Sequence, residues 1–251
     1  MLRTQTVMGM PVSINITENN IRENVFEKVF SYFRSIDERF SVYKETSEIT
    51  KINHGIIKEK DYSEDMQKIF SLCEETKKMT DGYFDIKSPG GFLDPSGLVK
   101  GWSIYHAAEM LKSDGFENFY INVGSDIETR GKNEKGEPWK IGIRNPFKDE
   151  KEVIKIVNVS NRGVATSGNY LRGKHIYDPS NNNAPADKIA SITVIGPNIY
   201  EADRFATPAF AMGKKGIDFI ERLADFEGYS IEKNGTATMT SGFEKYVYLR
   251  L

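Results

Sequence analysis

The sequence predicts an α+β fold in which mixed or antiparallel sheets pack against helices. Several segments repeat apolar residues at helical spacing, and others alternate apolar and polar residues as strands do. The two kinds interleave without a regular strand–helix–strand repeat, so the pattern favours α+β over a doubly wound parallel sheet. The 251 residues contain no internal repeat, low-complexity tract or linker, and we therefore expect one domain spanning residues 1–251.

Four segments have the pattern of a helix. The first begins at Asn20, with Glu23 at the spacing of a capping box, and the second runs from about Ser63 to Met79. The third follows a glycine-rich stretch and is expected to end at Gly115, and the fourth begins near residue 198. The apolar stripe of the first helix, which we expect in the core, consists of Phe26, Val29, Phe30, Phe33 and Phe40.

Strands are predicted where apolar and polar residues alternate. The earliest strand carries Val12, Ile14 and Ile16 on one face. Near the C-terminus, the pair Asn234-Gly235 predicts a hairpin closed by a type I′ turn. Further strands are expected over residues 119–124, 139–143 and 191–196.

Charge and composition exclude several classes of protein. The formal net charge of −2 gives no basis for binding nucleic acid or an anionic membrane through overall charge. The single cysteine, Cys73, excludes an intramolecular disulfide and a multi-cysteine zinc site, and its helical apolar neighbours predict a buried thiol rather than a nucleophile. No apolar run approaches the roughly 20 residues that span a bilayer. The N-terminus lacks the apolar region of a secretory signal, so we expect a cytoplasmic protein.

Residues 90–104, GGFLDPSGLVKGWSI, combine glycines, a carboxylate and a lysine at the predicted start of a helix. Glycines let a backbone approach a ligand closely, and the N–H groups that open a helix favour an anion. Lys100 would hold a phosphate as a point charge, and Asp94 would accept a hydrogen bond from a ligand or face a metal. An ordinary strand-to-helix turn with solvated charges explains the same residues, and the stretch alone leaves both readings open.

Residues 201–213, EADRFATPAFAMG, place Asp203 and Thr207 four positions apart, on one face of a helix. A carboxylate and a hydroxyl are suitable ligands for a hard cation such as Mg²⁺, although such pairs are also common by chance. Pro208 removes a helical hydrogen bond to the carbonyl of Arg204. We therefore expect either a kink that turns an oxygen toward an ion, or an early end of the helix.

Residues 164–180, VATSGNYLRGKHIYDPS, open with small polar residues suited to line a ligand. His175, three residues before Asp178, is a candidate general base, and a purely structural histidine fits equally. Together the three motifs supply a phosphate-binding group, oxygen ligands for a cation and a base. Those are the parts required for metal-assisted chemistry on a phosphate or pyrophosphate.

The order of the motifs resembles that of the ApbE-like flavin transferases. The resemblance implies an ApbE-like fold and an enzyme that cleaves FAD with Mg²⁺, links FMN through its phosphate to a Thr or Ser of an acceptor protein, and releases AMP. The chain resembles a short member of the family, without the leader of many relatives. The resemblance covers nearly the whole chain, in VMGMPVSI, FSVYKETSEITKIN, DGYFD, LDPSGLVKGWSIYHAAEML, INVGSDIETRG, WKIGIRNP, VATSGNY, HIYDP, SITVIGPN and EADRFATPAFAMG.

The resemblance also implies roles for individual residues. The base that activates the attacking hydroxyl would be His175 or Asp85, and the sequence does not choose between them. The metal would be held by Asp203, Thr207 and a backbone carbonyl near Gly97. The residues expected around FAD are Met8, Tyr43, Tyr83, Phe84, Asp85, Asp94, Lys100 and Ile176.

Two other functions stay open at this point: a Mg²⁺-dependent FAD pyrophosphatase with water as acceptor, and a non-catalytic FAD-binding protein. The joint presence of Lys100, Asp203 and Thr207 favours catalysis, because storage of FAD requires no metal at the pyrophosphate. The chain departs from the usual family pattern at Pro208, at Val99 and in the segment after Asp178, which lacks a glycine turn.

Overall fold

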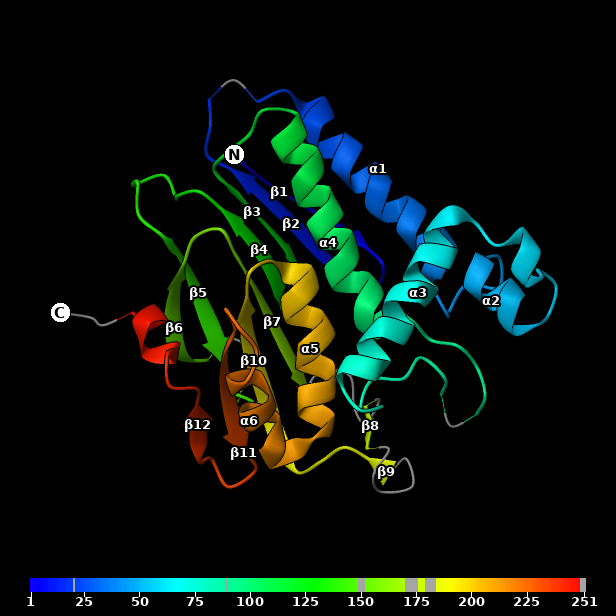
Figure 1. The fold of residues 1–251 in the computed structure, drawn as a ribbon. Coiled ribbons are helices and arrows are strands. Elements are labelled where there is room, and N and C mark those ends of the chain that lie inside the picture. The colour runs from blue at the N-terminus through cyan, green and yellow to red at the C-terminus, as the bar shows by residue number, and fades with distance from the viewer. Residues whose placement is uncertain (20, 89, 149–151, 170–175, 179–183, 249–251) are drawn as a thin grey trace.

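The computed structural model (Figure 1) describes residues 1–248 except 20, 89, 149–151, 170–175 and 179–183. Within these residues, eight strands form one antiparallel sheet in the order β1-β2-β3-β4-β7-β10-β11-β12. Antiparallel pairing throughout the described part confirms the predicted α+β class. The strands are β1 Leu2–Val7, β2 Met10–Ile16, β3 Phe119–Val123, β4 Asp126–Arg130, β7 Arg162–Gly168, β10 Ile189–Gly196, β11 Glu227–Glu232 and β12 Ala237–Met239.

Helices cover one face of this sheet, where α4 and α5 lie side by side over the strands (Figure 1). Strands β2 and β3 are neighbours in the sheet although about a hundred residues, including the first four helices, separate them along the chain. The long helices are therefore an insertion between two paired strands. The helices are α1 Glu23–Phe40, α2 Glu48–Asn53, α3 Glu64–Met79, α4 Ser96–Ser113, α5 Ile199–Ala211 and α6 Gly216–Glu221.

Alternate residues of the central strands enter two different cores. On β7, Ala165 packs in the core beneath the helices, whereas Val164 packs in a second core on the opposite face. Successive side chains of a strand point to opposite faces, so a strand buried on both sides must be apolar at consecutive positions. Strand β10 shows the same division, with Val194 facing the helices and Ile195 facing the second core.

The second core is covered by a hairpin of β5 Trp139–Arg144 and β6 Val153–Val159. Trp139 anchors this hairpin, because its ring packs edge-on against Tyr120 and its indole N–H donates to the carbonyl of Arg130 at 2.9 Å. A short pair, β8 Tyr177–Asp178 with β9 Ala184–Pro185, lies below α5 in Figure 1. The described chain thus has three layers: helices, central sheet and hairpin.

A third cluster of buried residues lies among the helices α1, α2, α3 and α4 and includes Cys73. The thiol is 2% exposed, and burial raises its pKa to about 12. A thiol protonated at neutral pH is a poor nucleophile. The prediction that Cys73 is a core residue is therefore confirmed.

One local prediction needs correction, and a second is narrowed. Only Gly235 of the pair Asn234-Gly235 has positive φ, at 87°, whereas a type I′ turn requires positive φ at both central residues. The hairpin is instead closed by a turn in which the Gly235 N–H donates to the Glu232 carbonyl at 2.9 Å. Of the two alternatives at Pro208, an early end is excluded, because helix α5 continues through Pro208 to Ala211, whereas a kink stays a prediction. Burial of Phe210 and Ala211 against the sheet offsets the lost hydrogen bond.

The start of α1 also differs from the expected capping box. The residue that precedes the first helical turn is Arg22, which makes no side-chain capping hydrogen bond. Asn20 lies outside the described residues. In contrast, α3 begins as predicted, because the Ser63 hydroxyl accepts a hydrogen bond from the Met66 N–H.

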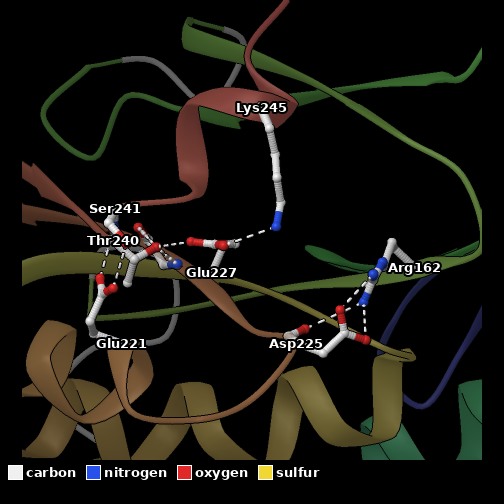
Figure 2. Close-up of polar contacts among 8 residues, drawn as sticks. Arg162, Glu221, Asp225, Glu227, Thr240, Ser241 and Lys245 are labelled. Atoms are coloured by element: carbon white, nitrogen blue, oxygen red, sulfur yellow. Dashed lines mark hydrogen bonds and ion pairs between the residues drawn. The ribbon is translucent and has the colours of Figure 1, made fainter.

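A polar cluster fixes the C-terminal edge of the sheet (Figure 2). The Thr240 hydroxyl accepts from the buried Gly228 N–H at 2.9 Å and donates to the carboxylate of Glu227.

Thr240→Val is expected to lower the free energy of unfolding by about 1–3 kcal/mol, because the buried N–H loses its partner. Urea denaturation measures this loss, with the exposed Thr238→Val as control. Equal stability of the two variants would contradict the assignment.

Candidate active site

A cavity of about 590 Å³ opens where the first turns of α4 meet α5, the end of β3 with the turn that follows it, and the end of β7. The loop of residues 82–88 closes one side. Ten of the predicted site residues line this cavity, although they come from segments far apart in the sequence. They are Tyr43, Tyr83, Phe84, Asp85, Asp94, Gly97, Lys100, Ile176, Asp203 and Thr207.

Two predicted residues are placed differently. Met8 is not among the described residues that line the cavity, although Gly9 and Met10, which follow it, do line it. Met8 has φ of 56° and packs between the two helix-side cores. His175 lies outside the described residues, so its predicted role as base stays a prediction.

Lys100 projects from α4 toward two buried carboxylates. Its Nζ lies 2.5 Å from Asp126 Oδ2 and 3.8 Å from Asp203 Oδ1. The side chain of Asp126 is fully buried, whereas that of Lys100 is 19% exposed and borders the cavity. Two carboxylates around one ammonium give this part of the site a formal charge of −1 when all three groups are ionised. The lysine is thus held in place before any ligand arrives.

Asp203 is buried on α5 and faces the backbone of α4. Its Oδ2 accepts a hydrogen bond from the Gly101 N–H at 2.8 Å. Burial raises the pKa of Asp203, Lys100 lowers it, and the neighbouring Asp126 raises it. A bound cation would therefore stabilise the ionised carboxylate that burial disfavours.

Glycines let the two helices approach closely enough for this contact. A Cβ atom on Gly101 would lie 2.6 Å from the Cβ of Asp203 and 2.8 Å from the carbonyl oxygen of Ile199. A Cβ atom on Gly97 would lie 3.3 Å from the Phe84 ring and 3.7 Å from Thr207 Cγ2. Only glycine fits at position 101 without a backbone shift, so the sequence of α4 fixes the distance to α5.

Hydroxyl groups from α5 and β7 also line the cavity. Thr207 Oγ1 lies 3.4 Å from Ser167 Oγ, which β7 contributes. The adjacent Thr166 donates its backbone N–H to Asp126 Oδ1 at 3.2 Å. The small polar residues after Val164 therefore line the cavity, as predicted from the sequence.

Asp94 and Asp85 both make local contacts within the cavity wall. Asp94 Oδ1 accepts from the Ser96 N–H at 3.0 Å and so helps to begin α4. Asp85 Oδ1 accepts from the Lys87 N–H at 2.9 Å, and its Oδ2 lies 2.7 Å from Lys77 Nζ. Each carboxylate borders the cavity while ordering its own loop.

The aromatic residues of the cavity differ sharply in exposure. Tyr43 is 94% exposed and stands at the rim, whereas Phe84 is 4% exposed and packs against Gly97. An exposed ring next to a cavity offers a free face on which a planar ligand can stack. Tyr43 has this property, and Phe84 contributes mainly to the shape of the wall.

Sequence reasoning missed three polar residues of the site. Asp126 lies within the segment INVGSDIETRG and is a buried partner of Lys100. Ser125 and Arg144 line the cavity as well. The available signal was a carboxylate directly after a glycine turn between two strands, a position that brings a charged group to the end of a sheet.

The donor atoms at the junction of α4 and α5 fit a hard cation. Asp203 supplies a carboxylate, Thr207 a hydroxyl, and the backbone near Gly97 lies beside them. Among the described residues, no group of three or more His, Cys, Asp or Glu side chains is placed to hold a metal ion. One carboxylate and neutral oxygens suit Mg²⁺, which retains waters or takes substrate phosphate oxygens as further ligands.

The sequence is similar to a known family and to individual members of it. The ApbE family model matches residues 8–89 and 87–229. The chain is 31% identical over 160 residues to an FAD:protein FMN transferase of Klebsiella pneumoniae, a match covering 61% of this chain and 46% of that protein. The corresponding protein of Vibrio cholerae is 33% identical over 135 residues, covering 51% and 40%. The matched stretches thus span less than half of these two relatives.

Solved structures show the same fold. The ApbE protein of Thermotoga maritima superposes with a TM-score of 0.87 at 20% identity, covering 99% of each chain. The flavin transferase ApbE of Vibrio cholerae gives 0.84 at 20% identity, covering 98% of each chain. No helix in the described part of the chain is long and apolar enough to cross a membrane. The family match, which extends over most of the sequence, establishes that this chain belongs to the ApbE family.

Proposed function

We propose that the protein is a Mg²⁺-dependent FAD:protein FMN transferase. The observation that carries the proposal is the convergence of Lys100, Asp203 and Thr207 on one cavity, together with an exposed aromatic ring at its rim. A cation, oxygen ligands and a stacking surface are the groups that a flavin dinucleotide requires. The names of the curated relatives support the same reaction class.

The proposed reaction transfers the FMN half of FAD, through its phosphate, to a hydroxyl of the acceptor protein. The hydroxyl oxygen of a Thr or Ser on the acceptor protein forms a bond to the phosphorus of the FMN half of FAD. The bond between that phosphorus and the bridging oxygen breaks, and AMP leaves with the bridging oxygen. The hydroxyl proton passes to a base, so the products are FMN-linked acceptor and AMP.

The residues of the cavity would have separate roles in binding the metal and the phosphates. Asp203, Thr207 and the backbone carbonyl near Gly97 would hold Mg²⁺, which when bound neutralises charge on the diphosphate. Lys100, fixed by Asp126, would orient a phosphate oxygen. Because these groups are ordered by contacts within the protein, little reorganisation is required on binding.

The flavin and adenine would contact the aromatic and backbone surfaces of the cavity. Tyr43 would stack on one of the two ring systems, and Tyr83, Phe84 and Ile176 would shape the wall. Asp94 would accept a hydrogen bond through the oxygen that Ser96 does not use. Met8 would act indirectly on ligand binding, through the adjoining Gly9, which lines the cavity.

Two residues are proposed as the base. Histidine is the side chain that most often acts as a general base near neutral pH, which favours His175, and Asp85 borders the cavity. Both oxygens of Asp85 are already engaged, one with Lys77 and the other with the Lys87 N–H, so neither is free to accept the hydroxyl proton without losing a contact. We therefore expect His175→Ala to slow transfer more than Asp85→Asn, and a comparison of the two rates at pH 7 tests this order.

Incubation with FAD, Mg²⁺ and a Thr-containing peptide tests the function. Mass spectrometry is expected to show the peptide gaining one FMN, and the same peptide with Ala in place of Thr is expected to gain nothing. Removal of Mg²⁺ with EDTA is expected to abolish the gain, and readdition of Mg²⁺ to restore it. FAD cleavage without a labelled peptide would favour a pyrophosphatase, and intact bound FAD would favour a binding protein.

The acceptor is proposed to be a protein rather than a free small molecule, because the relatives' names specify protein acceptors. A cytoplasmic location for this chain and its acceptor stays a prediction. Flavin fluorescence of proteins separated from cell fractions tests it, since covalently bound FMN survives denaturing electrophoresis.

A further inference from the structure

Glu128 on β4 is a fully buried carboxylate directed at the start of α5. Its Oε2 accepts a hydrogen bond at 2.6 Å from the backbone N–H of Ile199, the first residue of that helix. Its Oε1 lies 3.0 Å from a guanidinium nitrogen of Arg130 on the same strand. A carboxylate is therefore aligned with the positive end of the helix that carries Asp203 and Thr207.

Other contacts also fix the beginning of α5. Asn198 caps the helix through a hydrogen bond from the Glu201 N–H at 3.0 Å. Gly163 of β7 lies so close that an added Cβ would be 2.1 Å from the Ile199 nitrogen. The first turn is thus held between a glycine on β7 and a carboxylate on β4, with no room to slide over the sheet.

A shift of the first turn would reach the candidate metal ligands directly. Asp203 follows Ile199 by four residues, about one helical turn, and Thr207 follows by another turn. The Ile199 carbonyl also abuts Gly101, whose N–H donates to Asp203. Because a helix moves as a rigid unit, a displaced Ile199 would change the distances from Asp203 to both α4 and Lys100.

Burial disfavours the ionised form of Glu128. Burial raises the pKa of Glu128 to about 7, whereas Arg130 and the Ile199 N–H lower it and Glu109 raises it. Arg130 is shared, since it also lies 3.1 Å from Glu109 of α4. A buried acid is costly to the fold unless its oxygens have partners, and both oxygens of Glu128 have one, the Ile199 N–H and Arg130.

We propose that Glu128 is a positioning residue, which holds the first turn of α5 so that Asp203 and Thr207 stay in register with Lys100 and Gly97. The proposal rests on the proposed function only in taking Asp203 and Thr207 as the Mg²⁺ ligands. It assigns no contact between Glu128 and FAD or the metal. Its effect passes through the Ile199 N–H.

Two substitutions distinguish the effect of the side-chain length of Glu128 from the effect of its charge. Glu128→Asp keeps the charge but shortens the side chain, so its carboxylate no longer reaches the Ile199 N–H. Glu128→Gln keeps the length and an oxygen that accepts from Ile199 but loses the charge. The matched control is Glu227→Gln, in which the remote carboxylate between Thr240 and Lys245 is changed in the same way (Figure 2).

The first readout is independent of catalysis. Hydrogen exchange at pH 8, above the pKa of Glu128, is expected to be faster over residues 199–203 in Glu128→Asp than in the wild type. Glu128→Gln is expected to restore most of the protection, and Glu227→Gln to leave these amides unchanged. Unchanged exchange of the α5 amides in Glu128→Asp would overturn the proposal.

The second readout is Mg²⁺ affinity measured by calorimetry with FAD present. Replacing an outer residue that orients metal ligands commonly weakens binding by about 10- to 100-fold, and we expect that loss in Glu128→Asp. Glu128→Gln is expected to lie closer to the wild type. Equal affinities in Glu128→Asp and Glu227→Gln would overturn the proposal, even if both variants are less stable.

The outcomes separate this proposal from the proposed function. Failure of the wild type to label a peptide would refute FMN transfer, yet the exchange and affinity comparisons would still test Glu128. Conversely, efficient labelling by Glu128→Asp with unchanged Mg²⁺ affinity would refute the positioning role alone. The wild-type labelling result would then stand.

Discussion

Asp203→Ala is expected to reduce FMN transfer by at least about 100-fold while leaving measurable FAD binding. The carboxylate is the only charged ligand in the proposed metal set, and its loss would also remove a buried negative charge 3.8 Å from Lys100 Nζ. The aromatic surface of Tyr43 would remain to hold the flavin dinucleotide. Rates of peptide labelling and FAD fluorescence titration measure the two effects separately.

The control for this variant is Asp114→Ala, which removes an exposed carboxylate at the far end of α4. That carboxylate pairs with Lys28 and lies outside the cavity. We expect Asp114→Ala to label the peptide at the wild-type rate. Full activity in Asp203→Ala would refute the metal assignment, because no other described carboxylate of α5 faces this part of the cavity.

Gly101→Ala is expected to lower the free energy of unfolding by about 1–3 kcal/mol and to weaken Mg²⁺ binding. Alanine normally stabilises a helix relative to glycine by up to about 1 kcal/mol, so a loss would isolate the steric clash. The clash involves the Ile199 carbonyl, which is backbone and cannot turn aside, and the Cβ of Asp203. Separation of α4 from α5 would move Asp203 away from the Gly101 N–H.

Gly97→Ala provides the comparison for that variant. Its added methyl group would meet mainly the Phe84 ring at 3.3 Å, and a side chain can adjust more easily than a backbone carbonyl. We therefore expect a smaller loss of stability than in Gly101→Ala, measured by urea denaturation of both. A stability of Gly101→Ala equal to or above that of the wild type would contradict the close packing of α4 on α5.

Local patterns predicted most helices and strands because each depends on neighbouring residues. The stripe from Phe26 to Phe40 is buried along α1, and the alternation of Val12, Ile14 and Ile16 is buried along β2. In both cases a single face packs on a core, so the period of the sequence equals the period of the structure.

Other features depend on contacts that no local pattern contains. The pairing of β2 with β3 joins segments on either side of four helices. The partner of Lys100 is Asp126, which only the turn between β3 and β4 brings to α4. Helix α5 passes Pro208 because tertiary packing outweighs the local preference to end.

The candidate site is predictable from the sequence only when its motifs are considered together. Lys100, Asp203 and Thr207 were each consistent with an ordinary surface or turn residue when read alone. The fold places them on one cavity, because α4 and α5 cross at Gly101. The role of Glu128 was invisible in the sequence, since it depends on where the first turn of α5 lies over β4.

The central claim is that FAD cleavage is coupled to transfer onto a protein hydroxyl. The most direct measurement counts AMP and FMN-labelled Thr peptide in the same reaction, by chromatography and mass spectrometry. We predict one AMP for each labelled peptide, with both products reduced at least about 100-fold in Asp203→Ala. Release of AMP and free FMN with no labelled peptide would contradict it, as would FAD that stays intact in the presence of Mg²⁺.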